Sequence, residues 1–169
     1  MSAAELKKVA YPKYAEIMCR SPFDAMGFAV LDASSEIVWL SDESLGGCVS
    51  SLVAERRANE DNANPDGKLN LASGEAVLWH PIKDFVGATI GDALVVLEPS
   101  TGNDIDAVSG VLERVSQCIS KEYQLTAELT EMAFELGERY EELNLVIQSH
   151  EHVLHGLDGP SAMEALVRD

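Results

Sequence analysis

The sequence predicts an α+β protein, with a mixed or antiparallel sheet of about five to six strands flanked by helices and a long C-terminal coiled-coil helix. Two observations support this fold class. Within 27–97, short apolar runs alternate with turns that contain glycine and proline, a pattern typical of strands. Within 108–157 there is no proline, and apolar residues recur at helical spacing.

Three parts follow from this division: a sheet domain with an N-terminal helix at 1–100, a long helix at 101–158, and the start of a further domain at 159–169. The last part holds Ser161 and Glu164, which have the S-x-x-E spacing of a helix capping box. We therefore expect a helix to begin there and to belong to a domain that continues beyond residue 169.

The sheet domain begins with an amphipathic pattern at 3–19, in which Pro12 either ends one helical turn or starts the next. Apolar runs at 26–31 and 37–40 flank the polar segment DASSE, which predicts a β-hairpin. A short helix is expected next, because four apolar residues fall on one helical face: Leu45, Val49, Leu52 and Val53.

The second half of the sheet domain starts with a polar loop at 59–67. Pro81 predicts an edge position or a strand end, because proline cannot donate to a sheet ladder. Gly87 and Gly91 predict a bend or a bulge. Three further strands are expected here, within 69–71, 76–82 and 86–97.

The long helix changes character along its length. Asn103 or Asp104 can cap its start, with Asp106 favourable in the first turn. From Leu125 onward the apolar spacing becomes heptads over four repeats, which predicts a coiled coil. Before that point, one apolar stripe should lie on the sheet, formed by Val108, Leu112, Val115 and Ile119.

The heptads predict a parallel homodimer through the long helix. The a positions are Leu129, Leu136, Leu143, His150 and Leu157, the d positions are Leu125, Met132, Arg139, Val146 and Val153, and the e positions include Tyr140, Ile147 and Leu154. The g positions hold glutamates opposite apolar e positions, so the usual ion pairs between g and e positions are missing. The wide apolar stripe therefore predicts that the two paired helices also pack against another helix, such as the N-terminal one, or belong to a four-helix bundle. The expected interface residues are Leu125, Leu129, Met132, Leu136, Arg139, Tyr140, Leu143, Val146 and Ile147.

Charge and hydropathy exclude several classes of partner. The net charge of −17 opposes binding to nucleic-acid phosphates and to anionic membrane surfaces. No apolar run approaches the roughly 18 residues of a spanning helix. Because the first residues also lack the apolar core of a signal peptide, we expect a cytoplasmic protein with no nucleic-acid or membrane partner.

Metal and catalytic motifs are weak in this sequence. Cys19, Cys48 and Cys118 are scattered, without the spacing of a zinc site or of a disulfide framework. The three histidines near the end of the helix, within 150–155, fit a solvated face favoured by the helix dipole better than a metal site. No phosphate-binding glycine loop and no nucleophile elbow occurs. We expect no cofactor, no metal and no enzymatic activity.

Four side chains are candidate ligand-binding residues: Trp39, Trp79, His80 and Arg56. His80 either faces a pocket and titrates there, points outward, or is a satisfied core residue. The two tryptophans suit core or sheet-face packing as well as a ligand cage. Arg56 either binds an anion or caps helix carbonyls and pairs with surface acids.

The chain resembles a known family in two places. The order helix, two strands, helical insert, three strands and long helix, with HPI followed by VGATIGDALVVL, resembles a GAF domain. The segment EYQLTAELTEMAFELGERYEELNLV, at 122–146, is similar to the signalling-helix linker after N-terminal GAF-like sensors in bacterial signal-transduction proteins, although Ile147 stands where that linker often has tyrosine. The resemblance implies an output domain after the linker, such as a diguanylate cyclase or phosphodiesterase unit of cyclic-di-GMP turnover, a phosphatase or a histidine kinase.

Three functions are compatible with these features. The first is a sensory and dimerisation module that passes a conformational signal through a parallel coiled coil, with an unidentified small-molecule ligand. The second is an acidic coiled-coil adaptor that binds protein and no small molecule. The third is a small enzyme, such as the methionine sulfoxide reductases of the GAF family, which would need the three cysteines to converge. We expect the first.

Overall fold

The computed structural model describes residues 6–20, 23, 25–58, 67–71, 74–98 and 105–157, with the side chains of 55–58 and 151–157 outside the description. The chain divides into two compact units, Met1–Ala127 and Glu128–Asp169. Helix α4 (Ile105–Leu157) contributes to both units. The domain boundaries at 100 and 158 stay predictions, and the expected loop at 59–66, the cap at Asn103 or Asp104 and the helix at 159–169 lie outside the described residues.

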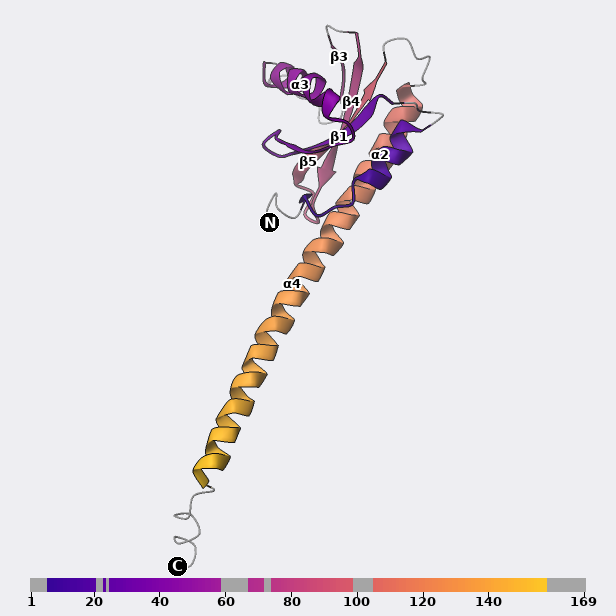
Figure 1. Ribbon diagram of the computed structural model, residues 1–169. Coiled ribbons are helices and arrows are strands. Elements are labelled where there is room, and N and C mark those ends of the chain that lie inside the picture. Colours follow the sequence, from indigo (N-terminus) through magenta and orange to yellow (C-terminus); the bar gives the residue numbers. More distant parts are fainter. Residues whose placement is uncertain are drawn as a thin grey trace, which may run out of the picture. The chain divides into compact units, whose positions relative to one another are not determined.

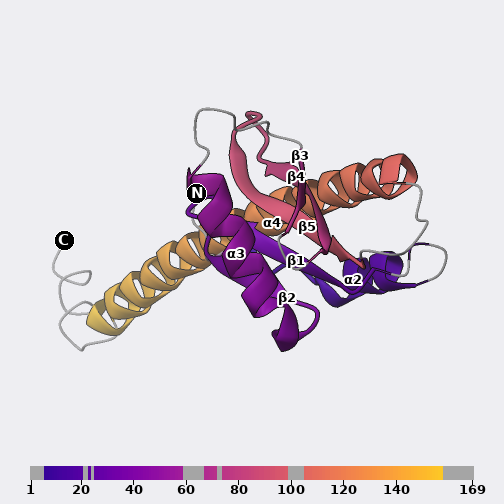
Figure 2. The same ribbon diagram turned by 90° about the horizontal axis from the view of Figure 1, so that it is seen from above.

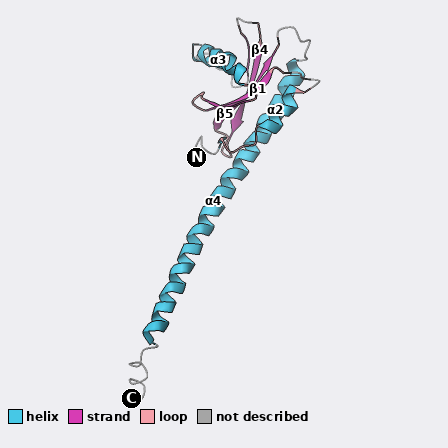
Figure 3. Cartoon of the chain, in the orientation of Figure 1, coloured by secondary structure: helices cyan, strands magenta, loops and turns pink. Residues whose placement is uncertain are grey.

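The first unit contains a fully antiparallel sheet (Figures 1 and 3). In the described part of the chain it has five strands in the order β2-β1-β5-β4-β3. This confirms the predicted α+β fold class and the predicted order of elements. The strands are β1 (Gly27–Asp32), β2 (Ile37–Leu40), β3 (Gly67–Asn70), β4 (Ala76–Lys83) and β5 (Thr89–Leu97).

The β1–β2 hairpin is held by the first residue of its turn. The Asp32 carboxylate accepts hydrogen bonds from the main-chain N–H groups of Ser34, at 2.8 Å, and Glu36, at 2.9 Å. Ser35 takes a positive φ of 62°, which lets the chain reverse. The segment DASSE therefore forms the turn that the sequence predicts.

Two layers of helix cover the two faces of the sheet, because side chains of a strand alternate between its faces. On one face, α2 (Pro12–Cys19) and the first part of α4 pack against residues such as Phe28 and Ile82. On the other face, α3 (Gly46–Ala58) packs against residues such as Leu31 and Leu94. Figure 2 shows α3 on the opposite side of the sheet from α2 and α4.

The amphipathic pattern at 3–19 forms a helix at α2 (Pro12–Cys19), whereas residues 7–11 are not helical, and the helix predicted after the hairpin is present as α3. Pro12 starts α2 rather than ending a turn, since its ring fits the first helical position. A short 3₁₀ turn (Glu43–Leu45) leads into α3, and the Asp42 side chain accepts a hydrogen bond from the N–H of Ser44. The buried side chains of the predicted apolar face are Leu45, Val49 and Leu52.

The end of β4 contains Pro81, and the two glycines singled out from the sequence lie close by, Gly87 in the β4–β5 turn and Gly91 on β5. β4 is an inner strand, but its pairing with β3 stops at Trp79, so Pro81 lies beyond the end of β3. Gly87 takes a φ of +83° in the β4–β5 turn, where glycine is favoured. A Cβ on Gly91 would lie 2.2 Å from the carbonyl oxygen of Leu31, so only glycine fits between these strands.

The first part of α4 lies on the sheet as the sequence predicts. Its apolar stripe is almost fully buried, with exposed fractions of 0–4% for Val108, Leu112, Val115 and Ile119. Tyr123 continues the buried face one turn later. No helix in the described residues is both long and apolar enough to cross a bilayer.

Candidate functional site

The predicted interface residues of α4 are exposed in the single chain. Arg139 is exposed as well and forms an ion pair with Glu142, with a distance of 3.1 Å between Nη1 and Oε2. A surface depression lies around it, lined by Met132 and Leu136 together with acidic side chains. The apolar members are 47–70% exposed: Leu125, Leu129, Met132, Leu136, Tyr140, Leu143, Val146 and Ile147.

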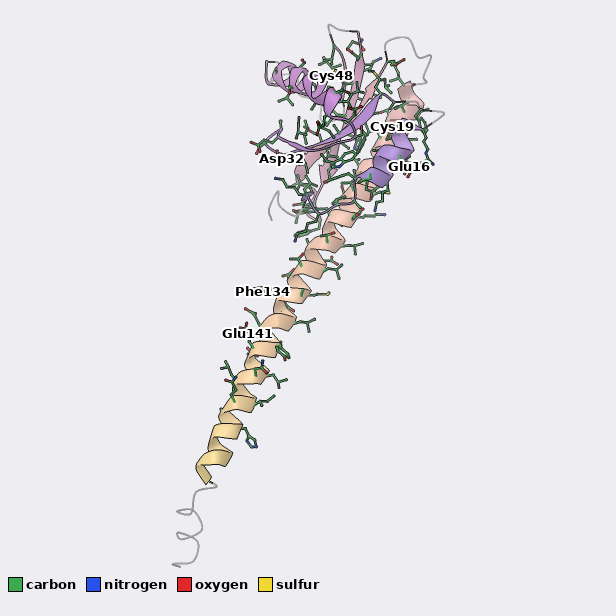
Figure 4. All side chains as sticks on the ribbon, in the orientation of Figure 1. Glu16, Cys19, Asp32, Cys48, Phe134 and Glu141 are labelled. Carbon is green, nitrogen blue, oxygen red and sulfur yellow. The ribbon has the colours of Figure 1, made fainter. Side chains whose placement is uncertain are left out.

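Two further apolar side chains of the same helix lie off this stripe. Phe134 and Leu145 are each 67% exposed. In the heptad register they occupy f and c positions, away from the a, d and e positions. The sequence analysis missed them because they do not repeat with the heptad. Figure 4 labels Phe134 and, one heptad later, Glu141 on the helix.

His80 lines a groove between the end of β4 and α4. Its Nδ1 lies 2.7 Å from the hydroxyl oxygen of Ser116, which itself donates to the carbonyl oxygen of Glu113 at 2.8 Å. The groove has a volume of about 530 Å³ and also contains Lys83 and Lys121. His80 therefore faces a pocket, as one of the three alternatives predicted, and its side chain is half-buried in the pocket wall.

The other three candidate ligand residues lie elsewhere. Trp39 sits on the same sheet face as His80 but on edge strand β2, packed against Tyr11 and Phe28 with ring centroids 5.9 and 6.3 Å apart. Strand order places two strands between Trp39 and His80, a separation of about 14 Å. Trp79 is buried on the opposite face with α3. Arg56 lies on α3, with its side chain outside the described residues.

The cysteines do not gather either. Cys19 on α2 and Cys48 on α3 are half-buried on opposite sides of the sheet (Figure 4). Cys118 on α4 is exposed. Burial raises the pKa of the Cys19 thiol, while a hydrogen bond with Ser41 lowers it by less. All three are free thiols. In the described part of the chain, no group of three or more histidine, cysteine or acidic side chains could hold a metal ion.

Glu122 joins the N-terminal segment to α4, and the sequence analysis did not single it out. One carboxylate oxygen accepts from the N–H of Ala10 at 3.0 Å. The other accepts from the hydroxyl of Tyr14 at 2.7 Å and pairs with the ammonium of Lys13 at 2.5 Å. These three partners are more than 100 residues away in sequence, so only the fold brings them together.

The ionisation of this cluster is shaped by burial and by its hydrogen bonds. Burial opposes the charge of Glu122, but the bonds from Lys13, Ala10 and Tyr14 outweigh it and lower the pKa of Glu122. Burial, followed by interaction with Glu122, raises the pKa of Tyr14 and of Tyr11. The carboxylate is therefore ionised and the two phenols are neutral at neutral pH.

Replacing Glu122 by glutamine should destabilise the first unit at pH 7 by about 1.5–3 kcal/mol, the usual contribution of hydrogen bonds to a charged group. Because the folded pKa of Glu122 lies below its unfolded value, its contribution is fully present above roughly pH 4.3 and disappears as pH falls through the folded pKa. Urea unfolding of both proteins at pH 7 and pH 3 measures this. A difference that is equally large at both pH values would contradict the assignment.

Comparisons with known proteins add little to these observations. No family model matches the chain, and no curated protein matches it. One solved structure that matches is described as the crystal structure of the E. coli DhaR(N)-DhaL complex. It shares 13% sequence identity and a TM-score of 0.49, over 85% of this chain and 53% of the solved chain. The chain thus spans about half the length of the protein it matches.

Proposed function

We propose that this chain is a GAF-like sensory and dimerisation module of a cytoplasmic bacterial signalling protein, without enzymatic activity of its own. Two copies associate through the exposed heptad stripe of α4, and changes in the sheet domain reach an output domain through that helix pair. The output domain would belong to one of the classes that the linker resemblance implies, including cyclic-di-GMP turnover. The single observation that carries the proposal is the exposed stripe itself.

The size of the stripe supports pairing with a second copy. A leucine-sized side chain gains about 1.5–3 kcal/mol on full burial at about 25 cal/mol per Å², which corresponds to roughly 60–120 Å² each. Eight such side chains, half to two thirds exposed, offer on the order of 500 Å² per protomer. Two copies together reach the roughly 1,000 Å² that a specific interface needs.

A parallel arrangement follows from the proposed role. A signal can pass to a following pair of domains only if both helices leave the sensors in the same direction. In a parallel pair, each d residue faces the same residue of the partner across the axis. A cysteine at a d position then approaches its own copy closely enough for a disulfide, which needs a Cα separation of about 4.4–6.8 Å.

Disulfide cross-linking tests the orientation directly. In a chain whose exposed Cys118 is replaced by serine, Met132→Cys and Val146→Cys should each form a covalent dimer on mild oxidation. Phe134→Cys is the matched control, because Phe134 is as exposed as Met132 but lies off the stripe. Non-reducing electrophoresis reads the product. An antiparallel pair can self-link at one of the two d positions at most, so linking at only one position contradicts the proposal.

A further inference from the structure

The groove between β4 and α4 has an unusual charge lining for so acidic a chain. The chain carries 12 lysine and arginine residues against 29 acidic ones. Two of those lysines, Lys83 and Lys121, line this groove. In the described residues, neither forms an ion pair with a carboxylate, and the same holds for Lys68 and Arg114. Two lysines without an ion pair in the described residues therefore line one groove.

The backbone around these lysines is fixed by the fold. The N–H of Lys83 donates to the hydroxyl of Ser120 at 3.0 Å, and that hydroxyl donates to the carbonyl oxygen of Ser116 at 2.9 Å. These bonds hold the end of β4 against the turn of α4 that precedes Lys121. Lys83 and Lys121 thus lie close together in the fold, one on each wall of the groove.

Two acidic side chains, Asp84 and Glu113, also line the groove, and each is engaged in hydrogen bonds of its own. The carboxylate of Asp84 accepts from the N–H groups of Val86 and Ala88, at 3.0 and 2.9 Å, and so closes the β4–β5 turn. Glu113 accepts from the side chain of Gln117 at 3.3 Å. It lies eight residues from Lys121 on α4, a rise of about 12 Å along the helix. Glu113 therefore lies too far along α4 to pair with Lys121.

Neutral polar groups complete the end of the groove near Lys121. Gln124 lies one turn after Lys121 and lines the same space, with His80 and the buried Ser116 on the adjoining wall. Charge-assisted hydrogen bonds from ammonium groups to phosphate or carboxylate oxygens are about twice as strong as neutral ones. Amide and imidazole groups beside them suit the polar remainder of a small organic molecule.

We propose that this groove binds a small organic anion, with Lys83 and Lys121 holding its phosphate or carboxylate group and Gln124 and His80 contacting its polar remainder. The ligand bridges the sheet and α4, because each lysine belongs to a different wall. Its role as the signal that reaches the helix pair rests on the proposed signalling function, whereas the binding itself does not.

Calorimetric titration of the full chain with inorganic phosphate, pyrophosphate and succinate tests the proposal. Ionic strength is kept constant with sodium chloride, so that general screening does not mimic binding. The double variant Lys83→Gln/Lys121→Gln should lose at least tenfold in affinity for whichever anion binds. Lys68→Gln on β3 is the matched control, since Lys68 is exposed and lies outside the groove. Phosphates and carboxylates are distinguished by which probe binds.

Three outcomes would overturn the inference: no binding of any of the three anions to the unmodified chain, equal affinity in the double variant, or an equal loss in Lys68→Gln. Circular dichroism of each variant checks that it remains folded. The test of anion binding can also be distinguished from the test of the proposed helix pair. Loss of anion binding with intact cross-linking at Met132→Cys refutes the groove alone, and anion binding without cross-linking refutes the helix pair alone.

Discussion

Replacing Leu136 by aspartate is expected to convert the proposed dimer into a monomer, while the same replacement at Leu145 leaves it intact. The two leucines are 70% and 67% exposed in the single chain. They lie nine residues apart, which is two and a half helical turns, so they occupy opposite faces of α4. Only Leu136 belongs to the heptad stripe, at an a position.

The size of the effect follows from symmetry. Each dimer loses two buried leucines, about 3–6 kcal/mol together, before the cost of burying two carboxylates. The dimer dissociation constant should therefore rise by at least about a hundredfold. Sedimentation equilibrium of the two variants beside the unmodified chain measures this. If both variants dissociate alike, added negative charge rather than the stripe controls association, and the interface is misplaced.

Replacing Arg139 by leucine should tighten the dimer and reduce the response to signal in a full-length protein. Arg139 occupies a d position, where its charge interrupts an otherwise apolar seam. In the part of the chain that the structure describes, it pairs with exposed Glu142, and exposed ion pairs contribute little to stability. Leucine at both copies adds about 3–6 kcal/mol of burial at most, so the dissociation constant should fall by up to roughly 10²–10⁴-fold.

Arg139→Lys is the control for this prediction, since lysine keeps the charge and can keep the contact with Glu142. Its dissociation constant should stay close to that of the unmodified chain. A marginal seam is the property that a two-state transmitting element needs. An Arg139→Leu variant with unchanged dissociation constant and unchanged response would show that the seam does not pass through this residue.

The helices and strands of the fold could be predicted from the sequence, because local patterns of residues determine them. Strand alternation located the β1–β2 hairpin, and the apolar stripe that starts at Val108 located the sheet-facing side of α4. Heptad spacing picked out side chains such as Leu136 that the single chain leaves exposed. Pro12 was ambiguous from sequence, because it is tolerated both at the first turn of a helix and after its end.

The candidate sites could be predicted only in part, because they depend on contacts between distant segments. Trp79 and His80 were named together as ligand candidates, but as neighbours in one strand they point to opposite faces of the sheet and cannot belong to one site. Glu122 and its partners near Ala10 are 112 residues apart, and no local pattern links them. The approach of Lys83 to α4 at Ser120 likewise depends on how the helix lies along the sheet.

Sedimentation equilibrium of the full chain, beside a chain that ends at Ala127, tests whether the stripe of α4 joins two copies. The cut at Ala127 keeps Glu122 and Tyr123, which pack within the first unit, and removes most of the stripe. We expect a dimer for the full chain and a monomer for the shortened one. A full chain that stays monomeric at all concentrations would contradict this expectation, and so would a shortened chain that dimerises as tightly as the full one.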